Sequence, residues 1–190
     1  SVYSPFLLAL VIEQASGSSF EKFLHEALFA PAGMTDTELE QRMTVDAPLR
    51  SKAFDAGGNR DYFPLRVTLP LVYTNATDLF SWARTLRKGD LIQERELSRL
   101  ATPLADRLDI HGYTEQQTIF GNVRRENGAV VTIRHQGGHS HFNSLLFIDL
   151  KSNVTVVVLT NHAAEGELYR VADKVYALAT EPATNAANPP

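Results

Sequence analysis

The segment with the clearest chemical potential lies late in the chain, where two adjacent glycines stand between histidines in the run His135-Gln136-Gly137-Gly138-His139. Adjacent glycines beside a strand allow a ligand or another backbone to approach closely. A backbone N–H in such a place can point at a developing oxyanion, and a nearby imidazole can donate a hydrogen bond or carry positive charge. The alternative interpretation is a glycine-rich hairpin with a surface histidine, and the residues alone leave both open.

The histidines of this region could also bind a metal. His139-x-His141 places two imidazoles on one face of a strand, with His135 close by. No carboxylate lies between them, so we expect no metal and no cofactor. The chain contains no cysteine, which excludes disulfides, thiolate nucleophiles and zinc–thiolate sites.

The composition excludes two classes of partner. The formal net charge of the 190 residues is -4, and no run of Lys and Arg is present, so we expect no nucleic acid. The longest apolar run, residues 6–12, is far shorter than the about 20 residues that a bilayer span needs. We therefore expect no membrane span, and the sequence leaves the cellular compartment unknown.

Helices dominate the first part of the chain. Residues 6–15 are almost uniformly apolar and end at Ser16-Gly17, which predicts a buried helix. Ser18-x-x-Glu21 predicts a capping box for a second helix that stops at Pro31. Residues 35–71 show little periodicity and predict a long surface excursion.

Three further helices follow from sequence signals. Asn75-x-x-Asp78 predicts the cap of one helix, a shorter one is expected near residues 93–100, and an apolar stripe predicts a closing amphipathic helix. The members of that stripe are Leu168, Val171, Ala172, Val175 and Leu178.

Strands dominate the last third. Residues 118–123 and 129–133 are joined through Asn127-Gly128, a strong hairpin signal, and residues 144–150 and 154–160 form a second pair. The predicted fold class is α+β, an antiparallel sheet flanked by helices. We expect a single domain portion over residues 1–180, with mainly helix and loop in 1–117, the sheet and last helix in 118–180, and a disordered tail in 181–190.

Five segments together resemble a known family of serine hydrolases. The chain is similar, from its start to about residue 178, to β-lactamases of class C, D-Ala-D-Ala carboxypeptidases, penicillin-binding proteins and related esterases, and the resemblance implies their fold, incomplete at the N-terminus. The segments that carry it are Glu13-Gln14-Ala15-Ser16-Gly17, Pro31-Ala32-Gly33-Met34, Tyr73-Thr74-Asn75-Ala76-Thr77-Asp78-Leu79, His135-Gln136-Gly137-Gly138 and Val156-Val157-Val158-Leu159-Thr160-Asn161.

The resemblance assigns roles to the glycine-rich segment. It is similar to the family's third motif, so His135 would be an electrophile or a contact for a substrate carboxylate, and the N–H of Gly138 would help to hold the oxyanion. Both are the catalytic candidates of this chain. Gln136, which replaces a hydroxyl residue of the family, Gly137 and His139 are the substrate-binding candidates.

The resemblance also implies what we expect this chain to lack. In the family a Ser followed three residues later by Lys attacks a carbonyl carbon, with a Tyr assisting. We expect that nucleophile outside this chain, and an ungapped alignment puts the Tyr just before Ser1, with Val2 in place of the family's Asn. Tyr3-Ser4-Pro5 is the alternative, which requires a three-residue deletion in the helix.

Two functions follow as expectations. The first is part of a serine hydrolase that acts on an amide or ester of a small or peptide-like substrate through an acyl-enzyme, and that is expected to be inactive as this chain alone. The second is a hydrolase-derived module that binds a peptide, glycan or protein without catalysis. Because the family's N-terminal part contributes strands, we expect an uncovered sheet edge and self-association or pairing with an N-terminal segment.

Overall fold

The computed structural model describes residues 4–39, 51–61, 72–103, 108–110, 113–118, 121–139, 141–162 and 165–181. The chain divides into two compact units, Ser1–Glu94 and Arg95–Pro190. The expected disordered tail lies outside the described residues except for its first residue, Glu181.

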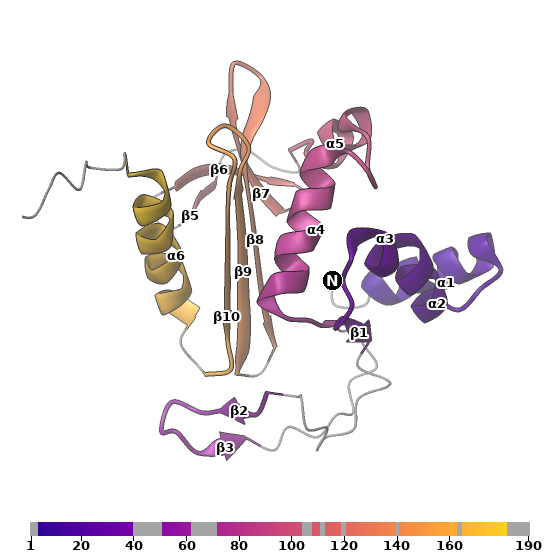
Figure 1. Cartoon of the computed structure of the whole chain (residues 1–190), viewed down its shortest axis with the longest axis horizontal. Coiled ribbons are helices and arrows are strands. Elements are labelled where there is room, and N and C mark those ends of the chain that lie inside the picture. Colours follow the sequence, from indigo (N-terminus) through magenta and orange to yellow (C-terminus); the bar gives the residue numbers. More distant parts are fainter. Residues whose placement is uncertain are drawn as a thin grey trace, which may run out of the picture. The chain divides into compact units, whose positions relative to one another are not determined.

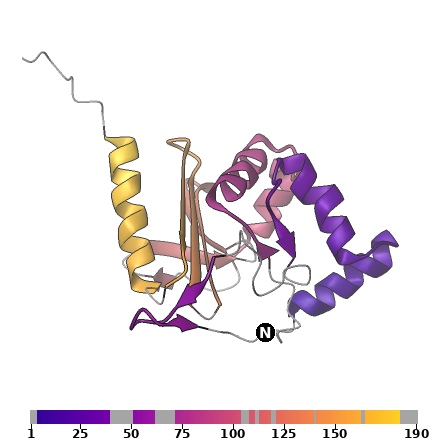
Figure 2. The same cartoon turned by 60° about the horizontal axis from the view of Figure 1, so that its bottom comes forward.

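Short helices build the first part of the N-terminal unit (Figures 1 and 2). Helix α1 spans Ser4–Ser16, α2 spans Phe20–Leu24, a π-helical turn η1 spans His25–Phe29, and α3 spans Ala30–Ala32. Gly33 ends this run in a left-handed conformation with φ 71, as a residue without a Cβ readily can. The predicted cap of the second helix was off by one residue, because the side chain of Ser19, not Ser18, accepts the hydrogen bond from the N–H of Lys22.

The prediction that the first apolar helix is buried was wrong. Helix α1 has no buried residue, and its most exposed apolar side chains are Leu7, Leu8, Leu10 and Val11, with exposed fractions of 65%, 60%, 56% and 62%. The opposite side of the helix carries Glu13, whose carboxylate accepts a 2.7 Å hydrogen bond from the N–H of Phe20. Among the described residues, the face of α1 that carries these four apolar side chains is therefore left exposed.

The long excursion predicted for residues 35–71 is partly described and contains two small strand pairs. β1 (Glu38–Leu39) pairs with β4 (Val72–Tyr73), and β2 (Ala53–Phe54) pairs with β3 (Arg60–Asp61). Residues 40–50 and 62–71 lie outside the described part. The excursion is therefore held at both of its ends by one antiparallel pairing, that of β1 with β4.

Helix α4 (Ala76–Lys88) begins where Asn75-x-x-Asp78 predicted it. The side chain of Asn75 accepts from the N–H of Asp78 at 2.8 Å. The carboxylate of Asp78, 3% exposed, accepts hydrogen bonds from the N–H of Asp36 and the hydroxyl of Thr37 at 2.9 and 2.7 Å. A buried carboxylate with such donors is well compensated, and here it ties the segment before β1 to the start of α4.

A six-stranded antiparallel sheet fills the C-terminal unit among the described residues, in the order β10-β9-β8-β7-β6-β5. It follows α5 (Glu94–Leu100) and begins earlier in the chain than residue 118. Its strands are β5 (Leu108–Ile110), β6 (Tyr113–Thr118), β7 (Gly121–Glu126), β8 (Ala129–His139), β9 (Phe142–Asp149) and β10 (Val154–Thr160).

Both predicted hairpins form in this sheet. Asn127 and Gly128 have φ values of 50 and 85, which are the positive angles that the tight turn between β7 and β8 requires. β9 and β10 pair along their whole length, from Asp149 with Val154 to Asn143 with Thr160. The predicted strand 118–123 instead contains the ends of two paired strands, because β6 ends at Thr118 and β7 starts at Gly121; residues 119–120 lie outside the described part.

Helix α6 (Glu165–Thr180) lies along β9 and β10 (Figure 1). Its predicted inward stripe is only partly correct: Leu168 and Ala172 are buried, but Val171, Val175 and Leu178 are exposed, and Tyr169 takes their place in the core. The resulting cluster unites the helix with one face of the sheet and consists of Leu145, Phe147, Val156, Leu168, Tyr169 and Ala172.

Candidate active site

The glycine-rich segment lies at the end of β8, beyond the reach of its neighbour β7. β8 pairs with β7 only as far as Arg134 with Asn122, whereas its pairing with β9 continues from His135 with Leu146 to His139 with Phe142. Among the described residues, the last part of β8 therefore has a partner strand on one edge only. Such an edge leaves backbone donors and acceptors free for a ligand.

The direction of two carbonyl groups shows which backbone groups face that edge. A Cβ added to Gly121 on β7 would lie 2.6 Å from the carbonyl oxygen of Arg134, so this carbonyl points toward β7. The carbonyl of Gly137 accepts from the hydroxyl of Ser144 on β9, at 3.3 Å. Because N–H and C=O of one residue point the same way and the direction alternates in an antiparallel strand, the N–H of Gly138 faces the uncovered edge.

Side chains of β9 explain why this strand needs two glycines. A Cβ on Gly137 would lie 2.9 Å from Oγ of Ser144, and a Cβ on Gly138 would lie 2.8 Å from Oδ1 of Asn143. Asn143 in turn donates a 3.4 Å hydrogen bond to the carbonyl of His162 beyond β10. The sequence predicted that another group would approach these glycines closely. The structure shows that side chains of β9 occupy the positions where a Cβ of either glycine would lie.

His135 and Gln136 point to opposite faces of the sheet. The imidazole of His135 is exposed and lies beside Gly121, where an added Cβ would be 3.1 Å from its Nδ1. Gln136 faces α6, and its Oε1 accepts a hydrogen bond from the hydroxyl of Tyr169 at 2.5 Å. The structure therefore places the His135 side chain on the face of β8 away from α6 and directs the Gln136 side chain toward α6.

A buried ion pair supports the strand on the α6 side. Arg134 and Glu115, both almost fully buried, approach to 3.6 Å between Nε and Oε1. The guanidinium also lies over the rings of Phe147 and Tyr169, at 4.8 and 5.5 Å from their centres. Burial raises the pKa of the Glu115 carboxyl above its ordinary value, although the charges of Arg134 and Arg124 act in the opposite direction.

The remaining candidates are only partly described. His139 belongs to β8, but nothing is described of its side chain, and Tyr3 lies outside the described residues. Where side chains are described, no group of three or more His, Cys, Asp or Glu residues is placed to hold a metal. Within the same part of the chain, no helix is long and apolar enough to cross a membrane.

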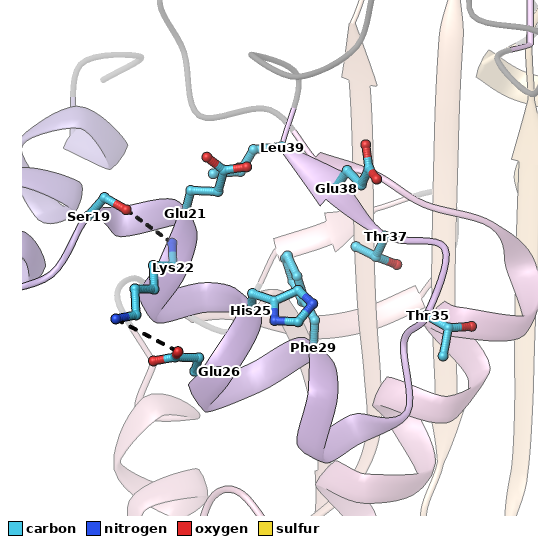
Figure 3. Close-up of a pocket in the computed structure, with 10 residues that line it drawn as sticks. All are labelled: Ser19, Glu21, Lys22, His25, Glu26, Phe29, Thr35, Thr37, Glu38 and Leu39. Carbon is cyan, nitrogen blue, oxygen red and sulfur yellow. Dashed lines mark hydrogen bonds and ion pairs between the residues drawn. The ribbon is translucent and has the colours of Figure 1, made fainter.

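The N-terminal unit has a separate groove, between α2–η1 and the segment 35–39, with a volume of about 460 Å³ (Figure 3). Phe29 and Leu39 are its apolar lining residues, and the other side chains drawn in Figure 3 are polar or charged. These are Ser19, Glu21, Lys22, His25, Glu26, Thr35, Thr37 and Glu38.

Ser19 and Lys22 of this groove have the Ser-x-x-Lys spacing, so the spacing of the family's nucleophile does occur in this chain and was overlooked in the sequence. Their geometry is that of a helix cap. Oγ of Ser19 accepts from the backbone N–H of Lys22 at 3.3 Å, and Nζ of Lys22 lies 3.9 Å from the carboxylate of Glu26 (Figure 3). Ser19 is therefore engaged as a helix cap, and Lys22 forms an ion pair with Glu26.

Comparison with known proteins agrees with the fold and with the resemblance. Residues 3–181 match the family model described as Beta-lactamase, and the chain belongs to this family. It is 26% identical over 181 residues to penicillin-binding protein 4* of Bacillus subtilis (strain 168), covering 85% of this chain and 39% of that protein. The chain thus spans well under half of the length of this curated relative.

Two solved structures show the same fold. A penicillin-binding protein from Bacillus halodurans superposes with a TM-score of 0.71 at 21% identity, over 94% of this chain and 55% of that one. The octameric penicillin-binding protein homologue from Pyrococcus abyssi gives a TM-score of 0.74 at 16% identity, over 94% and 41% of the two chains. The α+β fold class is therefore confirmed.

Proposed function

We propose that this chain is the part of a serine hydrolase that carries the third-motif wall of its active site, and that the whole enzyme cleaves an amide or ester through an acyl-enzyme. The observation that carries the proposal is the end of β8. There, among the described residues, a strand of the family's fold has a partner on one edge only, and the N–H of Gly138 faces the other edge, three residues along the strand from the exposed imidazole of His135.

Each residue of the segment has a distinct part in this proposal. The N–H of Gly138 stabilises the negative charge that forms on the carbonyl oxygen when the nucleophile attacks. His135 donates to the substrate, and Gly137 keeps the strand close to Ser144. Because the Gln136 side chain is bonded to Tyr169, Gln136 contributes to binding through its backbone, and His139 contacts substrate at the end of the strand.

The nucleophile belongs, in this proposal, to a part of the enzyme outside these 190 residues. Ser19 is occupied as a helix cap and Lys22 is paired with Glu26, so neither is suited to attack a carbonyl carbon. The chain alone should not turn over substrate, since an oxyanion donor without nucleophile and base gives only residual acceleration.

Turnover assays on the purified chain test this assignment. We expect no hydrolysis of nitrocefin or p-nitrophenyl butyrate above buffer, in the chain or in its Ser19→Ala variant. Hydrolysis that disappears in Ser19→Ala would place the nucleophile at Ser19 and overturn the assignment. Addition of an upstream segment with its own Ser-x-x-Lys should restore turnover, and Gly138→Pro, which removes the N–H, should abolish it again.

The second candidate function is a binding module without catalysis. The direction of Gln136 favours it, because the side chain that replaces the family's hydroxyl residue turns away from the face of His135. A module predicts saturable binding of peptide or glycan that is weakened by His135→Ala, with no covalent acyl adduct in mass spectrometry even when the upstream segment is present. An adduct selects the hydrolase.

Partner contacts form the last part of the proposal. The exposed apolar side chains of α1, the outward stripe of Val171, Val175 and Leu178 on α6, and the outer edge of β10 are all surfaces that a soluble domain normally covers. β10 has the sequence Val-Thr-Val-Val-Val-Leu-Thr, without charge or proline. We infer that these surfaces mediate self-association or pairing with an N-terminal segment.

Light scattering at increasing concentration tests the association. We expect species larger than a monomer, and fewer of them in Leu8→Lys, Val175→Lys and Leu159→Lys variants, with Lys174→Arg as a surface control on α6. A monodisperse monomer at all concentrations would contradict the inference.

A further inference from the structure

Tyr169 on α6 contacts two residues of β8 that flank the exposed histidine. Its ring lies under the guanidinium of Arg134, and its hydroxyl donates to Oε1 of Gln136. The ring is 6% exposed and belongs to the core cluster that joins α6 to the sheet. Its position is therefore fixed by packing, independently of any ligand at the edge of β8.

These two contacts affect His135 because successive side chains of β8 alternate between the two faces of the sheet. Side chains of successive residues point to opposite faces of a sheet, so Arg134 and Gln136 face α6 while His135, between them, faces away. Holding the residues on both sides of His135 restricts the two peptide units that orient its Cα–Cβ bond. Gly138, whose N–H also faces the edge, is separated from the restrained Gln136 by only one residue, Gly137, so the same contact also restricts its position.

This end of β8 needs such a restraint. It lacks β7 on one edge, and glycines lower the stiffness of the backbone. On the α6 face, the hydroxyl of Tyr169 donates a hydrogen bond to the side chain of Gln136, and this bond comes from a helix rather than from the neighbouring strand.

We infer that Tyr169 is a positioning residue for the active-site edge: its hydroxyl, acting through Gln136, holds the end of β8 so that the His135 imidazole and the Gly138 N–H keep their mutual arrangement. The inference deepens the proposed hydrolase function and rests on it for its catalytic meaning. This role explains why Gln136 stands where the family has a hydroxyl residue, because the longer side chain of Gln136 can reach Tyr169 on α6.

Amide hydrogen exchange of the chain, followed by NMR, tests the inference without any need for turnover. Tyr169→Phe keeps the ring over Arg134 and removes only the donor. A neutral hydrogen bond contributes about 1 kcal/mol, so we expect exchange in residues 135–139 to accelerate about fivefold. The imidazole signal of His135, assigned with a His135→Gln variant, should shift as well.

Tyr176→Phe is the matched control, because it removes the other tyrosine hydroxyl of α6, which donates to Asp149 at 2.5 Å. It should change exchange near Asp149 and leave residues 135–139 and the His135 signal unchanged. Gln136→Met removes the acceptor at similar size, and the double variant with Tyr169→Phe should show no further acceleration.

Three outcomes would overturn the inference: unchanged exchange in Tyr169→Phe, acceleration spread evenly over the sheet, or additive effects in the double variant. The hydrolase proposal is judged separately, by the acyl adduct described above. A local, coupled effect without an adduct would retain Tyr169 as a positioning residue for a binding edge and reject the catalytic role.

Discussion

Two tyrosines of α6 make the same kind of hydrogen bond in two regions with different electrostatics. Tyr169 donates to the neutral amide of Gln136, beside the buried pair of Arg134 and Glu115, and Tyr176 donates to the carboxylate of Asp149, which also caps the turn before β10. About two helical turns separate them, so both lie on the inward face of the helix. The comparison shows that one helix can form a hydrogen bond to the proposed active-site edge at one position and to a hairpin turn at another.

The two regions also shift the pKa values of their carboxyl groups in opposite directions. Burial raises the pKa of Glu115. For Asp149, burial acts upward, but hydrogen bonds from Tyr176, Ser152 and Lys151 outweigh it and hold the pKa below its usual value. A raised carboxyl pKa means that stability falls as pH rises through it, whereas a lowered one means that stability falls as pH decreases through it.

The largest effect is expected from breaking the buried pair. Glu115→Ala leaves the guanidinium of Arg134 buried without its carboxylate, which should lower the free energy of unfolding by about 3–5 kcal/mol in urea titrations. Glu126→Ala is the control, since Glu126 forms exposed ion pairs with Arg124 and Lys151 and its loss should leave the unfolding midpoint unchanged. Equal effects of the two changes would show that burial does not distinguish these pairs.

A smaller effect is expected at the other region. Asp149→Ala removes the acceptor of the Tyr176 hydroxyl and of the N–H groups of Lys151 and Ser152, so the free energy of unfolding should fall by about 2–3 kcal/mol. The same titrations measure it. Asp149→Asn, which keeps one carbonyl oxygen for the turn, should recover part of the loss, and no recovery would argue that charge alone matters here.

The smallest expected effect is the loss of stability when either tyrosine hydroxyl is removed, and its pH dependence should distinguish Tyr176 from Tyr169. Tyr176→Phe should cost about 1–2 kcal/mol near neutral pH and less as the pH falls below about 3.8, the ordinary value for Asp149, and through its lowered pKa. Tyr169→Phe should cost about 1 kcal/mol at every pH in that range, because Gln136 does not titrate. Urea unfolding at a series of pH values measures both losses. If the loss of unfolding free energy depended on pH in the same way for the two variants, the comparison would be contradicted.

Local signals in the sequence were reliable where a few neighbouring residues decide the outcome. Asn75 caps α4, and Asn127-Gly128 forms the turn of a hairpin, because each needs only a short side chain or a positive φ within the same turn. The predicted burial of residues 6–15 and of Val175 was wrong, because burial depends on which surface arrives to cover an apolar face. Neither surface is covered by the residues that the structure describes.

The candidate site shows the same division. The glycine pair and His135 could be found from residue types and spacing, but the contacts of Asn143 and Ser144 with those glycines depend on the register of β9 against β8. Nothing in the sequence marks Tyr169 as the partner of Gln136, since the two are distant in the chain and meet only when α6 packs on the sheet.

The sequence by itself determined the family, the order of helices and strands, and the place of the glycine-rich segment, because these depend on local patterns and on motifs in a fixed order. Only the tertiary structure decided that the described pairing of β7 with β8 ends at Arg134, that Gln136 turns toward α6, and that Ser19 is a helix cap despite its spacing to Lys22. The physical reason is that edges, faces and burial are properties of how elements pair and pack, and one residue's change in register reverses the face that a side chain occupies.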